Sequence, residues 1–217
     1  MEKQVIVFAT NNKNKLSEVR AILGERFEIK SLGEIGCNEE LPETHNTLEE
    51  NALEKALYVR KHYGYDSFAD DTGLEVDVLG GKPGVYSARY ATMAEEGWTD
   101  AASCSSHDAE ANMRKLLLML GDEKNRTAQF KTVVSLIMNG KTYQFTGIVR
   151  GVITTERHGG EGFGYDPVFR PYQEDPDDTT PVTLLDRTFA EMTSEEKNNI
   201  SHRGRAMQKL VGFLSQN

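Results

Sequence analysis

The hydrophobic pattern at the start of the chain predicts a strand, a polar turn and a helix. Residues 5–9 are apolar at consecutive positions, which is typical of a strand covered on both faces. Apolar residues then recur at helical spacing over 16–23, and Gly24 is expected to end this helix. A second strand is expected over 27–32.

The next part of the chain predicts a helix and a strand that runs into acidic residues. Thr47 and Glu50 have the spacing of a capping box, in which each side chain bonds the other residue's backbone N–H. Apolar residues line one face of the helix that follows, over 48–63. Residues 67–71 predict a short strand that ends on two aspartates.

A hairpin is the clearest prediction for the second half. Polar and apolar residues alternate over 126–138, Asn139-Gly140 is a preferred two-residue turn, and alternation resumes over 143–149. A helix from Ala109 is expected to bury Met113, Leu116, Leu117 and Leu120.

Two helices are predicted at the end of the chain, one capped by Thr193 or Ser194 and one beginning near Ser201. Loops are expected over 80–90, 159–166 and 173–181, and residues 91–106 have the pattern of a surface insertion. The order of elements predicts a single α/β unit with a mixed sheet over 1–217.

Composition narrows the class of partner. The 217 residues carry a net charge of −9, which argues against a nucleic acid polymer because such partners require a basic face. A small anion in a local basic pocket remains compatible. Two cysteines make no disulfide framework, and the first apolar run is too short for a signal peptide or a membrane helix, so we expect a cytoplasmic protein without membrane association.

The turn after the first strand is a candidate anion site. Backbone N–H groups at a helix N-terminus point toward an anion, and the helix dipole favours negative charge there. Lys13 and Lys15 lie in the first turn, where the dipole mildly disfavours a cation unless a phosphate is bound. The alternative is an ordinary Asn-capped helix with solvated lysines.

Asp70 and Asp71 form the second candidate site. Adjacent side chains of an extended strand point to opposite faces, so one carboxylate can be structural while the other faces a cleft. Such a carboxylate can hold Mg²⁺ or take a proton from water. The alternative is a turn in which Asp71 bonds its own backbone.

Two further segments suit a nucleotide base. Glycines surround aromatic residues and an aspartate over 159–166, an arrangement suited to stacking and to edge hydrogen bonds. Within residues 197–203, His202 and Arg203 open the last helix and offer donors to an anion or a carbonyl oxygen. The alternatives are a plain flexible loop and a solvated helix start.

Taken together, these segments resemble the inosine/xanthosine triphosphate pyrophosphatase family. The residues that carry the resemblance are Thr10-x-Asn12-x-x-Lys15, Glu50-Asn51-Ala52-x-x-Lys55-Ala56, Ala69-Asp70-Asp71-Thr72-Gly73-Leu74, Leu79-Gly80-Gly81-x-Pro83-Gly84-Val85-Tyr86-Ser87-Ala88-Arg89-Tyr90, Phe163-Gly164-Tyr165-Asp166-Pro167 and Glu196-Lys197-x-x-Ile200-Ser201-His202-Arg203.

The resemblance implies an elongated, bilobal α/β fold with a central mixed sheet flanked by helices, a cleft between the lobes and a homodimer. It implies Mg²⁺-dependent hydrolysis of ITP, dITP and XTP to the nucleoside monophosphate and pyrophosphate. Asp71 would accept the proton, and Glu43 with Asp71 would bind the metal. The residues implied in substrate binding are Thr10, Asn11, Asn12, Lys13, Asn14, Lys15, Lys55, Thr72, Phe163, Gly164, Tyr165, Asp166, Lys197, His202 and Arg203.

The sequence departs from the family pattern at a few positions. Thr72 stands where many members have Ser, Asn11 stands where Gly is common, and residues 91–106 and 173–183 are longer than usual. Three other functions remain open: a pyrophosphatase for other modified or pyrimidine nucleoside triphosphates, a homodimeric aspartic protease built on Asp71, and a non-catalytic nucleotide-binding module.

Overall fold

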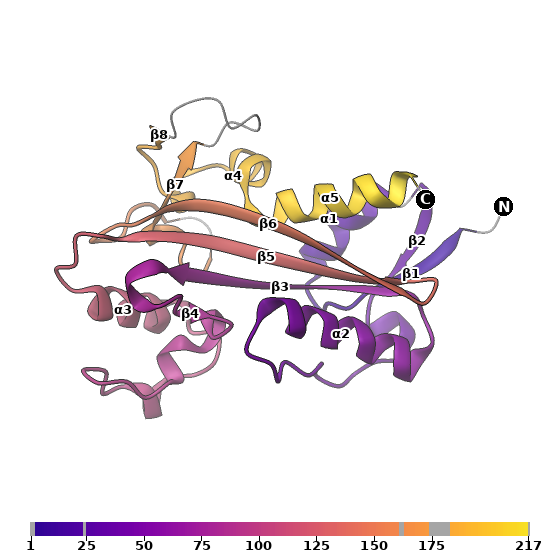
Figure 1. Ribbon diagram of the computed structural model, residues 1–217, viewed down its shortest axis with the longest axis horizontal. Helices are drawn as coiled ribbons and strands as arrows, with labels where there is room; N and C mark the ends of the chain where they lie inside the picture. The colour runs from indigo at the N-terminus through magenta and orange to yellow at the C-terminus, as the bar shows by residue number, and fades with distance from the viewer. Residues whose placement is uncertain (1–2, 24, 161–162, 174–182, 217) are drawn as a thin grey trace. The chain divides into compact units, whose positions relative to one another are not determined.

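The computed structural model describes residues 3–23, 25–160, 163–173 and 183–216 (Figure 1). Gly24, which was expected to end the first helix, lies outside the described residues. The same holds for Glu161 and Gly162 of the glycine-rich loop and for most of the loop expected at 173–181.

The chain alternates helices and strands, which confirms the α/β class. The helices are α1 (Lys13–Leu23), α2 (Leu48–Tyr63), α3 (Ala109–Leu120), α4 (Ser194–Ile200) and α5 (His202–Gln216). The strands are β1 (Gln4–Phe8), β2 (Phe27–Lys30), β3 (Ser67–Val76), β4 (Pro83–Gly84), β5 (Thr127–Met138), β6 (Lys141–Ile153), β7 (Phe169–Gln173) and β8 (Thr183–Leu184). Short 3₁₀ turns join them, including η2 (Asp77–Leu79), η3 (Ser87–Thr92), η5 (Asp166–Val168) and η6 (Phe189–Glu191).

The sheet is mixed, as expected. Its strand order is β2-β1-β3-β5-β6-β7-β8, and β4 pairs with β3. β1 is parallel to both β2 and β3, whereas β6 and β7 are antiparallel. No helix among the described residues has the length and apolar character needed to cross a membrane.

Two compact units divide the chain. Unit 1 comprises Met1–Asp71, Thr132–Gly147 and Arg205–Asn217, and unit 2 comprises Thr72–Lys131 and Ile148–Gly204. The division therefore falls within β3, directly after the Asp70-Asp71 pair.

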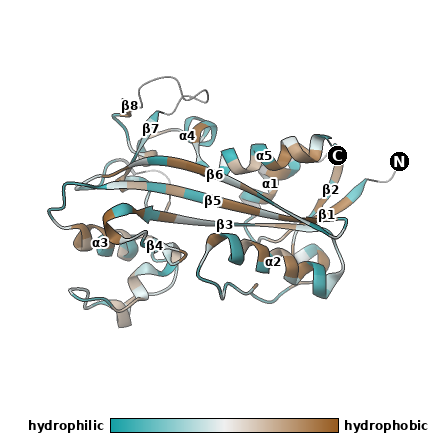
Figure 2. Cartoon of the chain, in the orientation of Figure 1, coloured by the Kyte–Doolittle hydropathy of each residue, from teal (hydrophilic) through white to brown (hydrophobic). Residues whose placement is uncertain are grey.

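Unit 1 covers its strands with helices on both faces (Figure 1). Ile6 and Phe8 of β1 pack in one apolar cluster with α1 and α5, and the alternate residues Val7 and Ala9 pack in another with α2. Strand side chains alternate between faces, and this two-sided burial explains why residues 5–9 are apolar at consecutive positions. Along α2 hydrophobic and hydrophilic positions alternate at helical spacing (Figure 2).

Unit 2 is built around its own aromatic core. Phe130, Phe169 and Phe189 lie in ring contact, and α3 adds Met113 and other apolar side chains to the cluster. Of the α3 residues expected in the core, Leu116 and Leu120 are also buried and Leu117 is half-buried.

The expectation of a surface insertion at 91–106 was wrong for part of that segment. Ala91 and Trp98 are buried with Ala111 of α3, and the Trp98 indole N–H donates to the carbonyl of Ala91 at 2.7 Å. A single tryptophan gives no periodic pattern, so its burial leaves no signal in the sequence.

The helix caps and the hairpin turn predicted from short sequence motifs are present in the structure. The Thr47–Glu50 capping box is present, with the Glu50 N–H donating to Thr47 Oγ1 at 3.2 Å, and Thr193 caps α4. Asn139 and Gly140 both have positive φ, of 51° and 74°, as their two-residue hairpin turn requires.

Two strand lengths differ from expectation. β3 is longer than 67–71 because Leu74 and Glu75 pair with β4. β2 ends earlier than residue 32, and its outer edge is partly occupied because Arg20 donates through Nε and Nη2 to the Ile29 carbonyl at 2.9 and 2.8 Å.

Candidate functional site

The turn before α1 is an Asn-capped helix start. Asn12 Oδ1 accepts the backbone N–H of Lys15 at 3.1 Å, and Thr10 Oγ1 accepts that of Asn12 at 3.2 Å. Asn11 and Asn12 are exposed, whereas the side chains of Lys13 and Asn14 lie outside the described part of the structure. The capped start was the alternative to an anion site, and anion binding by this turn stays a prediction.

Asp70 and Asp71 point to opposite faces of β3, as their adjacent positions predict. The Asp70 carboxylate pairs with Lys15 of α1 at 2.7 Å. The Asp71 carboxylate pairs with Lys55 of α2 at 3.3 Å. Each carboxylate therefore has a lysine from the helix that covers its own face.

Lys55 is the centre of an acidic cluster. Its Nζ lies 2.6 Å from Glu43 Oε1, 2.8 Å from the carbonyl oxygen of Asp70 and 3.3 Å from Asp71 Oδ1. Lys55 is buried because it shares the face of α2 that carries Asn51 and Ala52. We call Glu43, Lys55, Asp70 and Asp71, together with Lys15, the acidic cluster.

The loop that carries Glu43 is fastened to α2 by contacts that sequence analysis missed. Asn51 Oδ1 accepts the backbone N–H of His45 at 2.9 Å. The Glu54 carboxylate accepts the N–H and the hydroxyl of Thr44 at 3.0 and 2.9 Å. Asn51 belongs to the Glu50-Asn51-Ala52 motif, which was the one available signal, whereas Glu54 gave none.

Electrostatics in the acidic cluster favour proton transfer near neutrality. Burial raises the pKa of Asp71 to about 6; Lys55 opposes that rise and the charge of Glu43 adds to it. The pKa of Lys55 is raised, because burial lowers it but the carboxylates of Asp71 and Glu43 more than compensate. A carboxylate with a pKa near the working pH is suited to act as a general base.

The donor set also fits a magnesium ion. No group of three or more acidic, histidine or cysteine side chains within the described ranges is arranged to hold a metal alone. Mg²⁺ does not require one, since it is usually bound by one or two carboxylates with waters and substrate phosphates. Glu43 and Asp71, which meet at one ammonium group, supply two such carboxylates.

Unit 2 holds a second cluster, formed by Phe163, Asp166 and Lys197, which we call the aromatic cluster. Asp166 Oδ2 accepts the backbone N–H of Phe163 at 2.9 Å and pairs with Lys197 Nζ at 2.5 Å. The same ammonium lies 4.5 Å from the centre of the Phe163 ring. Asp166 is buried, whereas Phe163 is 67% exposed.

Two more predicted residues begin α5 in the same unit. The His202 ring stacks on Phe130, with centroids 4.7 Å apart and planes inclined by 13°. Arg203 Nη2 lies 3.5 Å from the hydroxyl of Thr72.

Gly164 and Tyr165 of the glycine-rich loop were also predicted to bind substrate. Gly164 takes a φ of 64°, and Tyr165 points into the unit 2 core, where its hydroxyl donates to the Ser87 carbonyl at 2.9 Å. The side chain of Tyr165 is therefore a core side chain, and a substrate contact by this residue stays a prediction.

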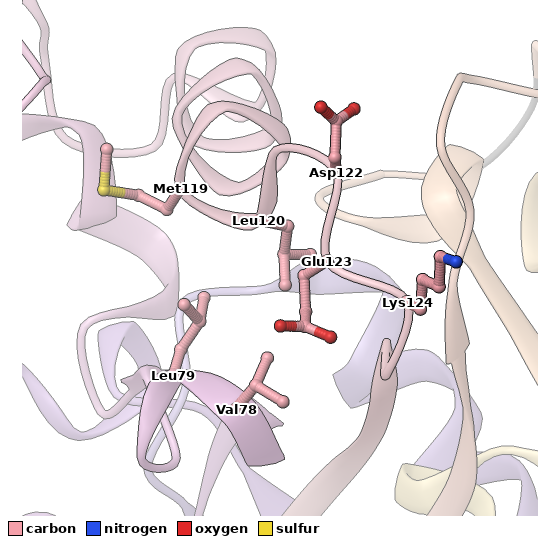
Figure 3. Close-up of a pocket in the computed structure, with 7 residues that line it drawn as sticks. All are labelled: Val78, Leu79, Met119, Leu120, Asp122, Glu123 and Lys124. Atoms are coloured by element: carbon pink, nitrogen blue, oxygen red, sulfur yellow. The ribbon is translucent and has the colours of Figure 1, made fainter.

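A separate hollow in unit 2 contains none of the predicted site residues. Figure 3 shows it at the end of α3, with a volume of about 530 Å³ and the lining residues Val78, Leu79, Met119, Leu120, Asp122, Glu123 and Lys124.

Comparisons with known proteins identify the family of the chain. The sequence profile of the Ham1 family matches residues 6–213. The chain is 50% identical over 210 residues to the dITP/XTP pyrophosphatase of Flavobacterium johnsoniae, covering 97% of each protein. It is 43% identical over 212 residues to the enzyme of the same name from Bacillus subtilis, covering 96% of each.

The fold also matches a solved structure. The Ham1 protein of Staphylococcus aureus superposes with a TM-score of 0.81 at 36% identity, covering 98% of this chain and 99% of that one. The match extends over nearly the whole length in both sequence and structure. The chain belongs to the Ham1 family.

Proposed function

We propose that the protein hydrolyses the aberrant purine nucleoside triphosphates ITP, dITP and XTP to the nucleoside monophosphate and pyrophosphate. The observation that carries the proposal is the acidic cluster, in which Asp71, with a pKa of about 6, lies beside Lys55 and Glu43. The relatives named dITP/XTP pyrophosphatases support the choice of substrate.

In this proposal the acidic cluster handles the phosphates. Asp71 accepts a proton from the attacking water, whose oxygen bonds to the α-phosphorus as the bond to the bridging oxygen breaks and pyrophosphate leaves. Lys15 and Lys55 neutralise phosphate charge, which phosphoryl chemistry requires more than covalent catalysis. Glu43 and Asp71 are the residues that would hold Mg²⁺, which when bound supplies further charge neutralisation and alignment.

The aromatic cluster and the start of α5 are proposed to recognise the base. The exposed Phe163 ring offers a stacking surface, and Lys197 and Arg203 offer donors. Donors suit O6 of hypoxanthine or xanthine. The 6-amino group of adenine would leave donor facing donor, at a cost of about 1–3 kcal/mol for each unpaired group.

A nucleotide panel tests the proposal. Purified protein is incubated with Mg²⁺ and ITP, dITP, XTP, GTP, ATP or modified and canonical pyrimidine triphosphates, and pyrophosphate and orthophosphate are measured separately. We expect pyrophosphate from the first three at much higher kcat/KM than from ATP.

Other outcomes would contradict the proposal in identifiable ways. Release of orthophosphate alone would show that the bond between the α- and β-phosphates is not the one cleaved. Equal rates on ITP and ATP would show that the enzyme does not select the base. Preference for pyrimidines would support the alternative substrate class. A repeat with EDTA in place of Mg²⁺ tests the metal, and undiminished turnover there would exclude it.

A further inference from the structure

A single residue, Ser201, joins α4 to α5. α4 ends at Ile200, Ser201 is extended, and α5 begins at His202. Ser201 Oγ accepts the backbone N–H of Gly204 at 3.0 Å, so Ser201 caps α5.

Gly204 leaves no room for a side chain at this junction. A Cβ atom there would lie nearer than 3.0 Å to the carbonyl oxygen of Asn198 in α4, and 3.1 Å from Ser201 Oγ. The obstructing atom belongs to the backbone, so rotation of a side chain cannot relieve the contact. The φ of Gly204 is outside the left-handed range, which leaves close approach as the reason for glycine.

This contact connects the two helices that carry the proposed base-reading residues. Lys197 precedes Asn198 in α4 and is paired with Asp166. His202 and Arg203 form the first turn of α5, where His202 stacks on Phe130. The distance between α4 and the first turn of α5 therefore sets the separation of Lys197 from His202 and Arg203.

We propose that Gly204 is a positioning residue for base selection, because its missing side chain lets α4 pack against the first turn of α5. The inference rests on the proposed function and deepens it. Gly204 contacts no substrate in this account; it acts through Lys197, His202 and Arg203.

Gly212 provides a matched control in the same helix. A Cβ at Gly212 has nothing within 4 Å, so Gly212→Ala adds the same methyl group to α5 without a collision. Alanine is also the better helix former. Gly212→Ala is therefore expected to keep wild-type kinetics and at least wild-type thermal stability.

The experiment compares wild type, Gly204→Ala and Gly212→Ala as full-length proteins. Steady-state kcat and KM are measured with ITP and ATP, together with the pH profile of kcat for ITP. Since a misplacement of about 1 Å can cost roughly 10²-fold, we expect Gly204→Ala to lower the ITP/ATP ratio of kcat/KM by about tenfold or more. The loss should come mainly from a higher KM for ITP, with the pH profile unchanged.

If Gly204→Ala does not fold, a second variant, Ser201→Ala, can still test the inference. Ser201→Ala removes the cap without adding volume, and it is expected to lower the ITP/ATP ratio in the same direction by a smaller factor. A folded Gly204→Ala whose ratio stays within twofold of wild type would overturn the inference. Where Gly204→Ala is unfolded, an unchanged ratio in Ser201→Ala would do the same.

Failure of the proposed function has a different signature. Wild type and Gly212→Ala would then both lack preference for ITP or release no pyrophosphate. A preference retained in those two proteins and in Gly204→Ala would refute only the positioning role.

Discussion

The acidic cluster and the aromatic cluster each contain a lysine paired with a carboxylate, buried in the case of Lys55 and half-buried in the case of Lys197, but the surroundings differ. Lys55 faces the carboxylates of Glu43 and Asp71 and a backbone carbonyl. Lys197 faces the single carboxylate of Asp166 and lies over the Phe163 ring. The acidic cluster holds three carboxylates and two ammonium groups, whereas the aromatic cluster holds one of each.

This difference suits the two clusters to different functions, phosphate chemistry and base recognition. Burial, to which the charge of Glu43 adds, raises the pKa of Asp71, and the neighbouring carboxylates attract cations, as chemistry on a triphosphate requires. A neutralised pair beside an exposed ring provides shape and fixed donors, as discrimination between bases requires. The comparison therefore predicts that variants in one cluster change rate and variants in the other change preference.

The largest expected effect comes from Asp71→Asn. Loss of a general base typically lowers turnover by about 10²–10⁴-fold, while ITP binding should persist because the lysines and the aromatic cluster remain. Single-turnover pyrophosphate release and equilibrium ITP binding measure the two properties separately. Turnover above about a tenth of wild type would exclude Asp71 as the base.

The two lysines give the most direct contrast. Lys55→Met should lower kcat/KM for ITP and ATP alike, by about 10²-fold, because loss of a preorganised charge affects any triphosphate. Lys197→Met should lower kcat/KM for ITP more than for ATP. Measuring both variants on both nucleotides tests the division of work, and an altered ITP/ATP ratio in Lys55→Met would break it.

Phe163→Ala is expected to have a smaller effect. Base stacking on an aromatic side chain is worth about 1–3 kcal/mol, so KM for ITP should rise roughly tenfold or more while kcat changes little. Folding stability should be unaffected, because the ring is 67% exposed. A lower melting temperature with unchanged KM would show that Phe163 is structural.

The smallest effect concerns stability and pH in metal-free protein. The folded-state pKa of Asp71 is about 6, against an ordinary value of 3.8, so folding favours its protonated form. The stability that protonation contributes is present below the ordinary pKa and is lost as the pH rises through about 6.

Asp71→Asn should therefore be more stable than wild type at pH 7, by about 1–2 kcal/mol, and the difference should shrink toward pH 5. Urea unfolding of both proteins in EDTA across this range measures it. A difference independent of pH would contradict the raised pKa.

Features set by neighbouring residues were predictable from the sequence. The Thr47 cap, the Asn139-Gly140 hairpin and the opposite orientations of Asp70 and Asp71 each depend on a few consecutive residues with fixed backbone geometry. The α/β class followed from the order of such elements.

Features set by distant partners were not predictable in this way. The extension of β3 depends on pairing with β4, and Trp98 is buried because α3 packs against it. The pairing of Lys15 with Asp70 and the fastening of Thr44 by Glu54 join residues from different elements. No local pattern marks such contacts in a single sequence.

The two hydrogen bonds from Arg20 to Ile29 have a consequence for self-association. β2 is the first strand in the sheet order, and an uncovered outer strand can template another chain. Arg20 occupies an acceptor that an incoming strand would use, and its charge opposes a flat apolar contact there. We expect that replacing this arginine by an apolar residue would leave the proposed catalytic groups in place and expose the sheet to edge-to-edge aggregation.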